Sequence, residues 1–441
     1  MSVRERSEAA AMLWLAAPLV AQQAGHHLMG VVDAAMLGRY SDTALAAAGV
    51  GNNVYFAISC VGMGIVMGMD TVVPQALGAG RHDDARRAVG AGVRLAILVG
   101  LIGTLLVLLS PVVLVLADVD KDVLYEARPF LYMRALGVVP FLLMIALRSY
   151  LAAHGKTRPM LVAMVVGNIA NALLDLALIY GVPALHIPPL GVLGAAGATT
   201  LVAILTTAVY ALGVRELDRG SKRPRSTAAD IIAIVRHGGP VGGQLLAEVG
   251  VFGIATVLAA RIGTVPAGAH SIALNLSSLT FSFSVGIATA TSVRVGHAVG
   301  AGDLALARRR GLLGIALGLV VMACFAATFL AIPRTLASGF SDDPSVVAAT
   351  IPLLQIAALF QLSDGTQAIG AGALRGRGDT RATLWGNLLG HYVVGLPIVL
   401  GLGFGAGLGA PGLWWGLSVG LTATALFLVA RFLRSTSRSP R

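Results

Sequence analysis

Apolar runs about as long as a bilayer is thick recur from one end of this sequence to the other. A transmembrane helix needs about 20 consecutive apolar residues, and charge, glycine or proline bounds each run here. The chain is 56% hydrophobic and 12% charged, about half the charged fraction of an average soluble domain. A soluble fold could not bury this much apolar surface, so the sequence predicts an all-α polytopic membrane protein. We expect twelve spans, at roughly 12–38, 46–76, 90–117, 129–153, 159–182, 191–214, 238–261, 267–297, 310–333, 346–374, 382–404 and 410–433.

The longest polar interval lies almost at the midpoint of the chain, from residue 215 to residue 237. It is rich in basic side chains, and similar apolar sequence lies on either side of it. We therefore predict a basic cytoplasmic linker at 215–237 between two related six-helix lobes, at 1–214 and 238–441. The basic residues of the interval are Arg215, Arg219, Lys222, Arg223, Arg225 and Arg236.

Two short motifs occur once in each half. The segment QALGAG at 75–80 resembles HAVGAG at 297–302, and GKTR at 155–158 resembles GDTR at 378–381. The copies are about 222 and 223 residues apart, a spacing that indicates an internal repeat. Because six spans per half is an even number, both halves enter from the same side and are parallel repeats. Two such lobes around a central cavity suggest a transporter.

The basic residues gather in alternate loops, with a bias of about four to one between the two sides. Cytoplasmic loops carry the excess of Lys and Arg, so we expect both termini and the linker in the cytoplasm, in a multi-pass protein of the inner (cytoplasmic) membrane. On this count Arg148 belongs to the cytoplasmic side, Arg134 belongs to the outer side, and only Arg94 and Arg294 lie within or near spans. The net charge of +11 comes from basic residues in these loops. We therefore expect no nucleic-acid partner.

Acidic residues sit inside the spans of the first half, where a charge costs about 2.5–3.5 kcal/mol even on a lenient insertion scale. Asp33 is about 8 Å from the outer end of its span, and Asp175 and Thr199 are about 12 Å deep at 1.5 Å per residue. Asn171 lies one helical turn from Asp175 and shares its face. Such an all-oxygen set suits a hard monovalent cation, with Asp33 and Asp175 as ligands if the ion is Na⁺. The alternative is a structural hydrogen-bond cluster between helices.

The second half has its own pair of interior acids. Glu248 and Asp364 each lie about 15 Å from the inner ends of their spans, near the midplane. They could hold a proton, a metal cation or a cationic drug, and the alternative is a protonated acid that fixes helix packing. Gln244 and Gln367 would line a cavity or bridge helices, whereas His391 is more typical of a core histidine.

These residues together resemble the multidrug and toxic compound extrusion (MATE) transporters, NorM-type branch. The resemblance covers essentially the whole chain and rests on VD at 32–33 with Gly38-Arg39, QALGAG at 75–80, Asn171 with Asp175, GAAGAT at 194–199, and Asp364 ahead of GAGALRGRGDT at 370–380. It implies a V-shaped pair of six-helix lobes that exports cationic, amphipathic compounds in exchange for inward Na⁺ or H⁺. It also implies an N-lobe cation site at Asp33, Asn171, Asp175 and Thr199, C-lobe carboxylates at Glu248 and Asp364, and a helix-bending role for Pro18.

The leading hypothesis is thus a cation-coupled multidrug antiporter that needs no cofactor and works as a monomer in the lipid bilayer. The alternative within transport is a flippase for lipid-linked precursors, a related fold with a basic cavity. The absence of deep Arg or Lys, apart from Arg94 and Arg294, disfavours it. An enzyme is not expected, because the sequence has no His/Glu metal pair, serine elbow or phosphate-binding loop.

Overall fold

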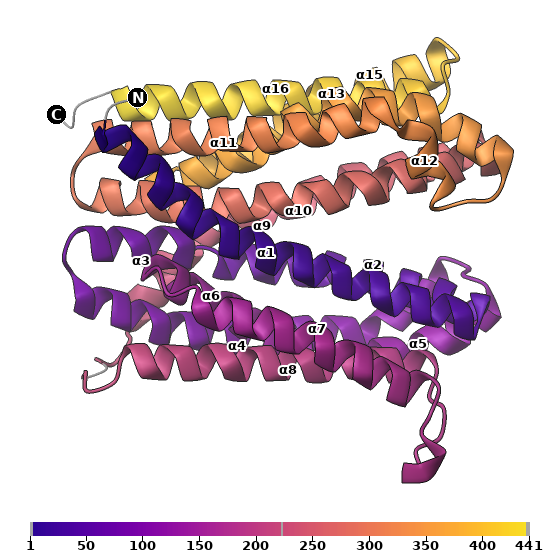
Figure 1. Cartoon of the computed structure of the whole chain (residues 1–441), viewed down its shortest axis with the longest axis horizontal. Helices are drawn as coiled ribbons and strands as arrows, with labels where there is room; N and C mark the ends of the chain where they lie inside the picture. Colours follow the sequence, from indigo (N-terminus) through magenta and orange to yellow (C-terminus); the bar gives the residue numbers. More distant parts are fainter. Residues whose placement is uncertain (1–2, 222–223, 438–441) are drawn as a thin grey trace. The chain divides into compact units, whose positions relative to one another are not determined.

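The computed structural model describes residues 3–221 and 224–437. Four of the basic residues counted above, Lys222, Arg223, Arg438 and Arg441, lie outside the described residues, as do the outermost ends of the two predicted lobes. Apart from one isolated bridge between Val182 and Ile187, the regular structure in the described part is helical, and the predicted all-α fold is confirmed (Figure 1). The elements are α1 (Val3–Tyr40), α2 (Asp42–Val66), α3 (Met69–Gly78), α4 (His82–Leu116), α5 (Lys121–Ala135), α6 (Val138–Ala153), α7 (Arg158–Ile179), η1 (Pro183–Leu185), α8 (Val192–Leu217), α9 (Ala228–Ile262), α10 (Thr264–Gly300), α11 (Leu304–Ala331), α12 (Pro333–Ser338), α13 (Pro344–Arg377), α14 (Thr380–Asn387), η2 (Leu388–Gly395), α15 (Leu396–Leu400), η3 (Gly401–Gly405) and α16 (Ala410–Ser437).

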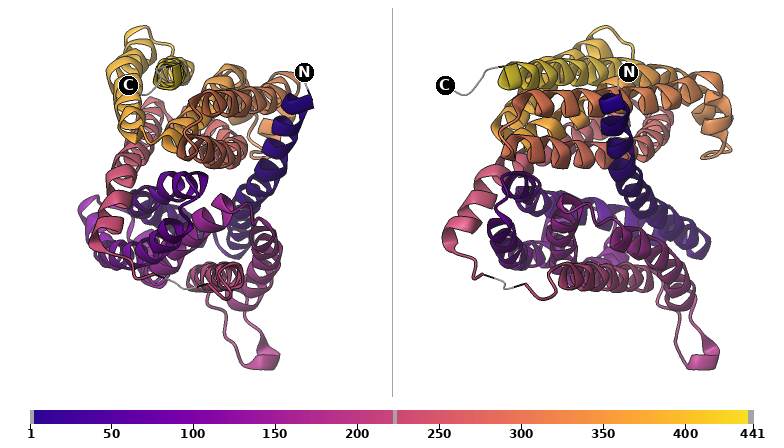
Figure 2. Two further views of the ribbon diagram at one scale, coloured as in Figure 1. Left: turned by 90° about the vertical axis from the view of Figure 1, so that its left-hand side faces the viewer. Right: turned by 60° about the vertical axis from the view of Figure 1, so that its left-hand side comes forward.

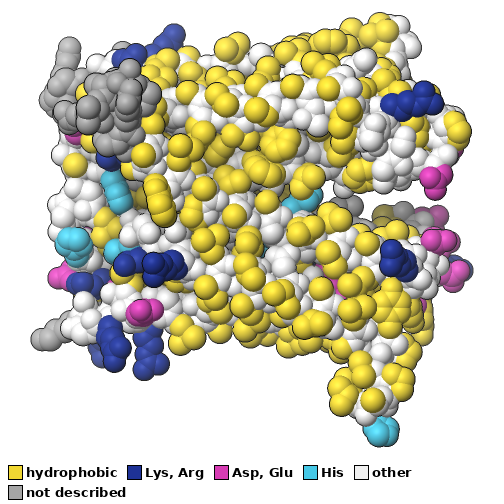
Figure 3. Space-filling view, viewed as in Figure 1, with side chains coloured by type: hydrophobic (Ala, Val, Ile, Leu, Met, Phe, Trp, Pro, Cys, Tyr) yellow, Lys and Arg dark blue, Asp and Glu magenta, His cyan; other side chains and the backbone are white. Residues whose placement is uncertain are grey.

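Ten helices in the described part are long and apolar enough to cross a membrane, and α5 with α6, bent by 44° at a short break, would form an eleventh. The one remaining predicted span, the first at residues 12–38, is helical throughout as part of α1. Its sequence is less apolar than that of the other ten helices, because the polar pairs Gln22-Gln23 and His26-His27 interrupt its apolar run. Figure 3 shows hydrophobic side chains over the helix middles, with charged groups toward the helix ends, as expected of membrane-spanning helices.

The chain forms two compact units, each of which consists mainly of one half. The first-half unit comprises Ala21–Leu77 and Arg81–Gly242, and the second-half unit comprises Met1–Val20, Gly78–Gly80 and Gly243–Arg441. The unit boundaries therefore fall inside continuous helices, so that α1 begins in the second-half unit and α9 begins in the first-half unit. The predicted lobes at 1–214 and 238–441 differ from these units chiefly in those two stretches.

One backbone contact and one side-chain ion cluster hold the first parts of α9 and α1 in their respective units. In the first part of α9, a Cβ on Gly238 would overlap the Ile65 carbonyl of α2. Only glycine therefore permits the two helices to approach so closely. At the start of α1, the carboxylate of Glu8 accepts hydrogen bonds from Arg310 Nε at 2.9 Å and Arg310 Nη2 at 3.1 Å, and it also pairs with Arg294.

Within the first-half unit, α7 lies along α8, and the hairpin that carries η1 extends beyond their common end (Figures 1 and 2). α4 packs against α6, and α2 packs against α5. Within the second-half unit, α13 is central and contacts α10, α11 and α16. A large apolar core there includes Phe360 and Trp414, whose rings meet edge to face.

The predicted repeat has the same turn in both halves. After the first motif, the N–H of Arg81 donates to the Ala76 carbonyl at 2.9 Å, and the N–H of Asp303 donates to the Ala298 carbonyl at 2.9 Å. Gly80 and Gly302 hold φ values of 73° and 78° in these turns, a conformation that favours glycine. The second motif repeats the pattern, because Lys156 N donates to Leu151 O and Asp379 N donates to Leu374 O, each at 2.9 Å.

The predicted linker at 215–237 is largely helical. α8 extends to Leu217 and α9 begins at Ala228, so the non-helical connection is shorter than the polar interval. The described part of this connection is held to α4: Arg86 donates to Ser221 Oγ at 3.1 Å, and Arg94 donates to the Ser226 carbonyl at 3.0 Å. The polar composition indicates that a connection lies here, but it overestimates its length. Charged residues at both ends of the polar interval belong to the helices α8 and α9.

The break between α5 and α6 positions one arginine, Arg134. Thr200 donates to the Met133 carbonyl at 3.3 Å and Thr104 donates to the Ala135 carbonyl at 3.1 Å, which satisfies backbone groups that the break frees. Arg134, which the loop charges assign to the outer side, lies beside this break with its guanidinium carbon 4.0 Å from the centroid of the Tyr55 ring.

Candidate cation sites in the two halves

Three helices of the first-half unit bring Asp33, Asp175 and Thr199 together. Thr199 on α8 donates its hydroxyl to Asp33 Oδ2 on α1 at 3.1 Å, and the carboxyl groups of Asp33 and Asp175 are close enough to interact electrostatically. The Thr199 hydroxyl also lies 2.9 Å from the Ala195 carbonyl of its own helix. It is therefore fixed between its own backbone and the acid.

The polar side chains next to this contact, Asn171 and Asp175, are buried without hydrogen-bond partners among the described residues. Asp175 is 0% exposed and Asn171, one turn earlier on α7, is 1% exposed. Within the described part of the chain, both oxygens of Asp175 and both amide atoms of Asn171 lack a hydrogen-bond partner. A buried polar group without a partner costs about 1–3 kcal/mol. The set therefore favours a proton or a small cation over two bare carboxylates.

The second-half unit presents a differently built site around Glu248. Gln244 on α9 donates to Glu248 Oε1 at 3.1 Å, and Gln367 on α13 donates to the same oxygen. The Gln367 amide also lies 3.3 Å from Asn387 Oδ1 on α14. Asp364, on α13 one turn before Gln367, is 6% exposed and interacts electrostatically with Glu248. Two acids and three amides thus meet at one level of this unit.

Sequence reasoning missed Asn387 and left the two glutamines undecided. Gln244 and Glu248 stand four residues apart on one helix face, which is a signal available in the sequence. Asn387 is completely buried in a span that the sequence treats as apolar, and its contact with Gln367 joins residues 20 positions apart. Only a structure of the packed helices brings these two residues together.

The remaining predicted residues lie elsewhere. Pro18 lies within the continuous helix α1, two residues before the boundary between the compact units. His391 is 1% exposed on the π-helical segment η2, with its ring 6.3 Å from that of Phe252.

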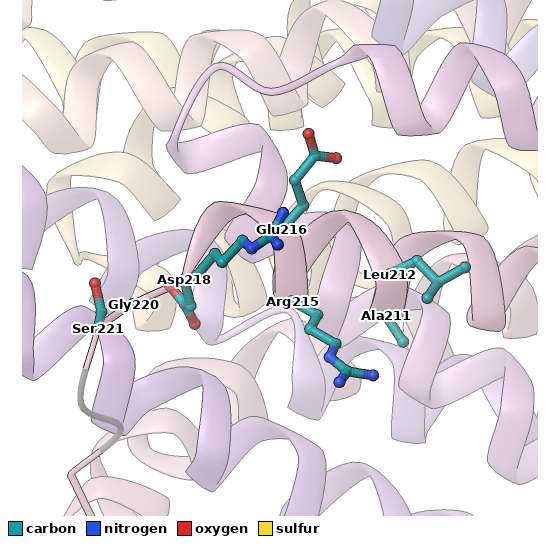
Figure 4. Close-up of a pocket in the computed structure, with 8 residues that line it drawn as sticks. Ala211, Leu212, Arg215, Glu216, Asp218, Gly220 and Ser221 are labelled. Atoms are coloured by element: carbon teal, nitrogen blue, oxygen red, sulfur yellow. The ribbon is translucent and has the colours of Figure 1, made fainter.

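A cavity of about 870 Å³ lies at the end of α8, where the connection to α9 begins. Figure 4 shows Arg215 and Glu216 pointing away from each other there. The predicted cation-site residues are not among those that line it. The lining residues are Ala211, Leu212, Arg215, Glu216, Asp218, Arg219, Gly220 and Ser221.

The two acid sites share one chemical design. Each holds two carboxyl groups from different helices together with neutral amide or hydroxyl groups, and the described residues contain no group of three or more His, Cys, Asp or Glu side chains placed to hold a metal ion. A pair of carboxyls with neutral partners suits a single charge better than a multivalent metal, which takes more oxygen ligands.

Comparison with known proteins agrees with this architecture. The family model MatE matches residues 18–177 and 240–400, one segment in each half. A probable multidrug resistance protein NorM from Deinococcus radiodurans is 38% identical over 99% of this chain and 97% of its own length. A protein of the same description from Pseudomonas putida is 34% identical over 98% of this chain and 96% of its own.

Solved structures share the fold at lower identity. The eukaryotic MATE transporter AtDTX14 has a TM-score of 0.89 at 21% identity, covering 99% of this chain and 98% of its own. A mutant of the Vibrio cholerae MATE transporter VcmN has a TM-score of 0.89 at 20% identity, covering 98% of this chain and 99% of its own. The full-length relatives and the two matched segments show that the chain belongs to the MatE family of multidrug efflux transporters.

Proposed function

We propose that the protein is a secondary active antiporter that exports organic cations in exchange for inward Na⁺ or H⁺ by alternating access. The observation that carries the proposal is the paired carboxyls in each half, Asp33 with Asp175 and Glu248 with Asp364. The names of the relatives, which describe multidrug resistance proteins, support drug export as the direction.

The coupling follows from charge competition. A carboxyl pair that carries a proton or Na⁺ loses its affinity for a cationic cargo, and a bound cargo displaces the ion. If each occupant favours a different arrangement of the helices, inward ion flow drives outward cargo flow. Asp33, Asn171, Asp175 and Thr199 would form the first ion site, and Glu248 and Asp364 would hold ion or substrate in the second half.

The setting proposed for this cycle is the inner membrane, with both termini in the cytoplasm and a monomer as the working unit. Pro18 would permit α1 to change its bend, because proline removes an intrahelical hydrogen bond. Its place two residues before the boundary between the compact units supports this role.

A flippase for lipid-linked precursors remains the second candidate. The argument against it is the absence of deep basic residues, and two arginines of the first-half unit weaken that argument. Arg148 on α6 is 3% exposed, and Arg134 lies half-buried against the Tyr55 ring. The interior acids and the identity to NorM relatives still favour the multidrug antiporter.

Reconstitution in liposomes tests the proposal. We expect uptake or release of ethidium under a Na⁺ gradient alone or a pH gradient alone, and at least a tenfold loss of coupled flux in Asp33→Asn and Asp364→Asn at normal protein levels. Asp42→Asn is the matched control, since Asp42 is exposed at the start of α2. Wild-type flux in both site variants would refute the assignments, and ethidium flux without either gradient would refute antiport.

A further inference from the structure

The first-half unit carries positive charge as well as acids: Arg148 is 3% exposed and Arg134 is half-buried. The Nε atoms of both Arg134 and Arg148 are buried and, among the described residues, have no hydrogen-bond partner. Within that same part of the chain, neither guanidinium forms an ion pair with a carboxylate. Removing a charge from water costs several kcal/mol, a cost that Arg134 carries only in part because it is half-buried. These side chains therefore suit an anionic partner that the chain itself does not supply.

Arg134 lies at the level of the first acid pair. Two consecutive residues of α8 establish this: Thr199 donates to the Asp33 carboxylate at 3.1 Å, and Thr200 donates to the Met133 carbonyl at 3.3 Å. Because neighbouring Cα atoms are about 3.8 Å apart, Asp33 and the backbone next to Arg134 lie in one layer of the unit.

One face of α1 links the two charges. His26 and Asp33 are seven residues apart, so they share a helix face about 10 Å apart along the axis. His26 interacts electrostatically with both Arg134 and Arg148. The arginines thus face the side of α1 that also carries the acid.

The surroundings of Arg134 fit a flat anionic group. A guanidinium presents its N–H groups in a planar fork that matches a carboxylate. The Tyr55 ring holds the guanidinium by its face and fixes the side chain before any ligand arrives. Tyr55 is itself 5% exposed, so this support is rigid.

We propose that Arg134, supported by Tyr55, is a subsite that binds the carboxylate of a transported molecule, while Asp33 and Asp175 bind its cationic group. This assignment rests on the proposed function and extends it: the substrates include molecules that carry both charges. Arg148 adds positive potential deeper in the same unit and makes no contact with the cargo.

A pair of dyes that differ only at the carboxyl group tests this subsite. Rhodamine 123 is a methyl ester with a net positive charge, and rhodamine 110 is the corresponding free carboxylate. We expect the wild-type protein to export both. Arg134→Gln should lose rhodamine 110 export at least tenfold relative to rhodamine 123, and Arg134→Lys, which keeps the charge without the fork, should lose less.

Arg128→Gln is the matched control, because Arg128 is exposed on the same helix and should leave the ratio of the two rates unchanged. Equal loss of both dyes in Arg134→Gln would overturn the subsite and assign Arg134 a structural role, as would an unchanged ratio. Wild-type export of rhodamine 123 without rhodamine 110 would also overturn it. Export of neither dye by the wild type would count against the proposed function itself.

Discussion

At the scale of single residues, one hydroxyl joins α8 to the first acid pair. Thr199 is the only neutral side chain among the described residues that hydrogen-bonds to Asp33, whereas Glu248 accepts hydrogen bonds from two glutamines. The first site therefore depends on fewer neutral groups than the second. Its ion affinity should be correspondingly sensitive to the loss of one donor.

Thr199→Val tests this sensitivity, since valine keeps the shape and removes the hydroxyl. A net hydrogen bond to a charged group contributes about 1.5–3 kcal/mol, so we expect the half-saturating Na⁺ or H⁺ concentration for coupled flux to rise at least tenfold. Thr199→Ser should restore it. Thr207→Val is the control, because Thr207 donates to the Pro140 carbonyl instead. Equal ion dependence in Thr199→Val and the wild type would remove Thr199 from the site.

The acids were predictable from the sequence and Arg134 was not, for a physical reason. An acid inside a long apolar run is costly wherever the run ends, so an error of several residues in the span boundaries leaves Asp33 or Asp364 interior. Arg134 lies near a predicted boundary, and its place depends on a break at Leu136–Gly137 that neighbouring threonines stabilise. The sequence contains those threonines but not their contacts with α5.

At the scale of elements, α1 owes its position in part to an ion cluster at its start. Glu8 precedes the predicted span, and hydrogen bonds from Arg310 together with the charge of Arg294 lower the pKa of its carboxyl to about 2. Its side chain is 17% exposed, so solvent screens the cluster only in part. The cluster holds the start of α1 in the second-half unit.

Glu8→Gln should therefore destabilise the protein by about 2 kcal/mol at neutral pH, allowing for some screening of the pKa shift. Because the folded pKa lies below the ordinary value, the contribution is complete above about pH 5 and is lost as the pH falls toward 2. Thermal unfolding of purified protein should show a gap between variant and wild type that narrows as the pH falls from 6 to 3.5. Glu216→Gln, an exposed change, is the control. A gap that stays constant with pH would exclude this ion cluster as its source.

At the scale of the whole molecule, the repeat was predictable from the sequence. The assignment of the first part of α1 to the second-half unit, and of the first part of α9 to the first-half unit, was not. The repeat is visible because glycine turns recur at a fixed spacing, and the backbone hydrogen bonds of both copies agree. The assignment is not visible, since α1 and α9 continue without a break across the boundaries between the compact units. A continuous helix carries no sequence mark where its neighbours change.

The orientation of the molecule in the membrane stays a prediction from the loop charges, and it decides which helix ends face the cytoplasm. Leu185, in the hairpin between α7 and α8, is 69% exposed and should face outward; Arg219, after α8, is exposed and should face the cytoplasm. In a Cys324→Ser background, which removes the exposed native cysteine, a membrane-impermeant maleimide should label Leu185→Cys in intact cells. It should label Arg219→Cys only after the membrane is opened. The reverse pattern would place the basic loops outside, against the bias that the translocation machinery imposes, and would refute the predicted orientation.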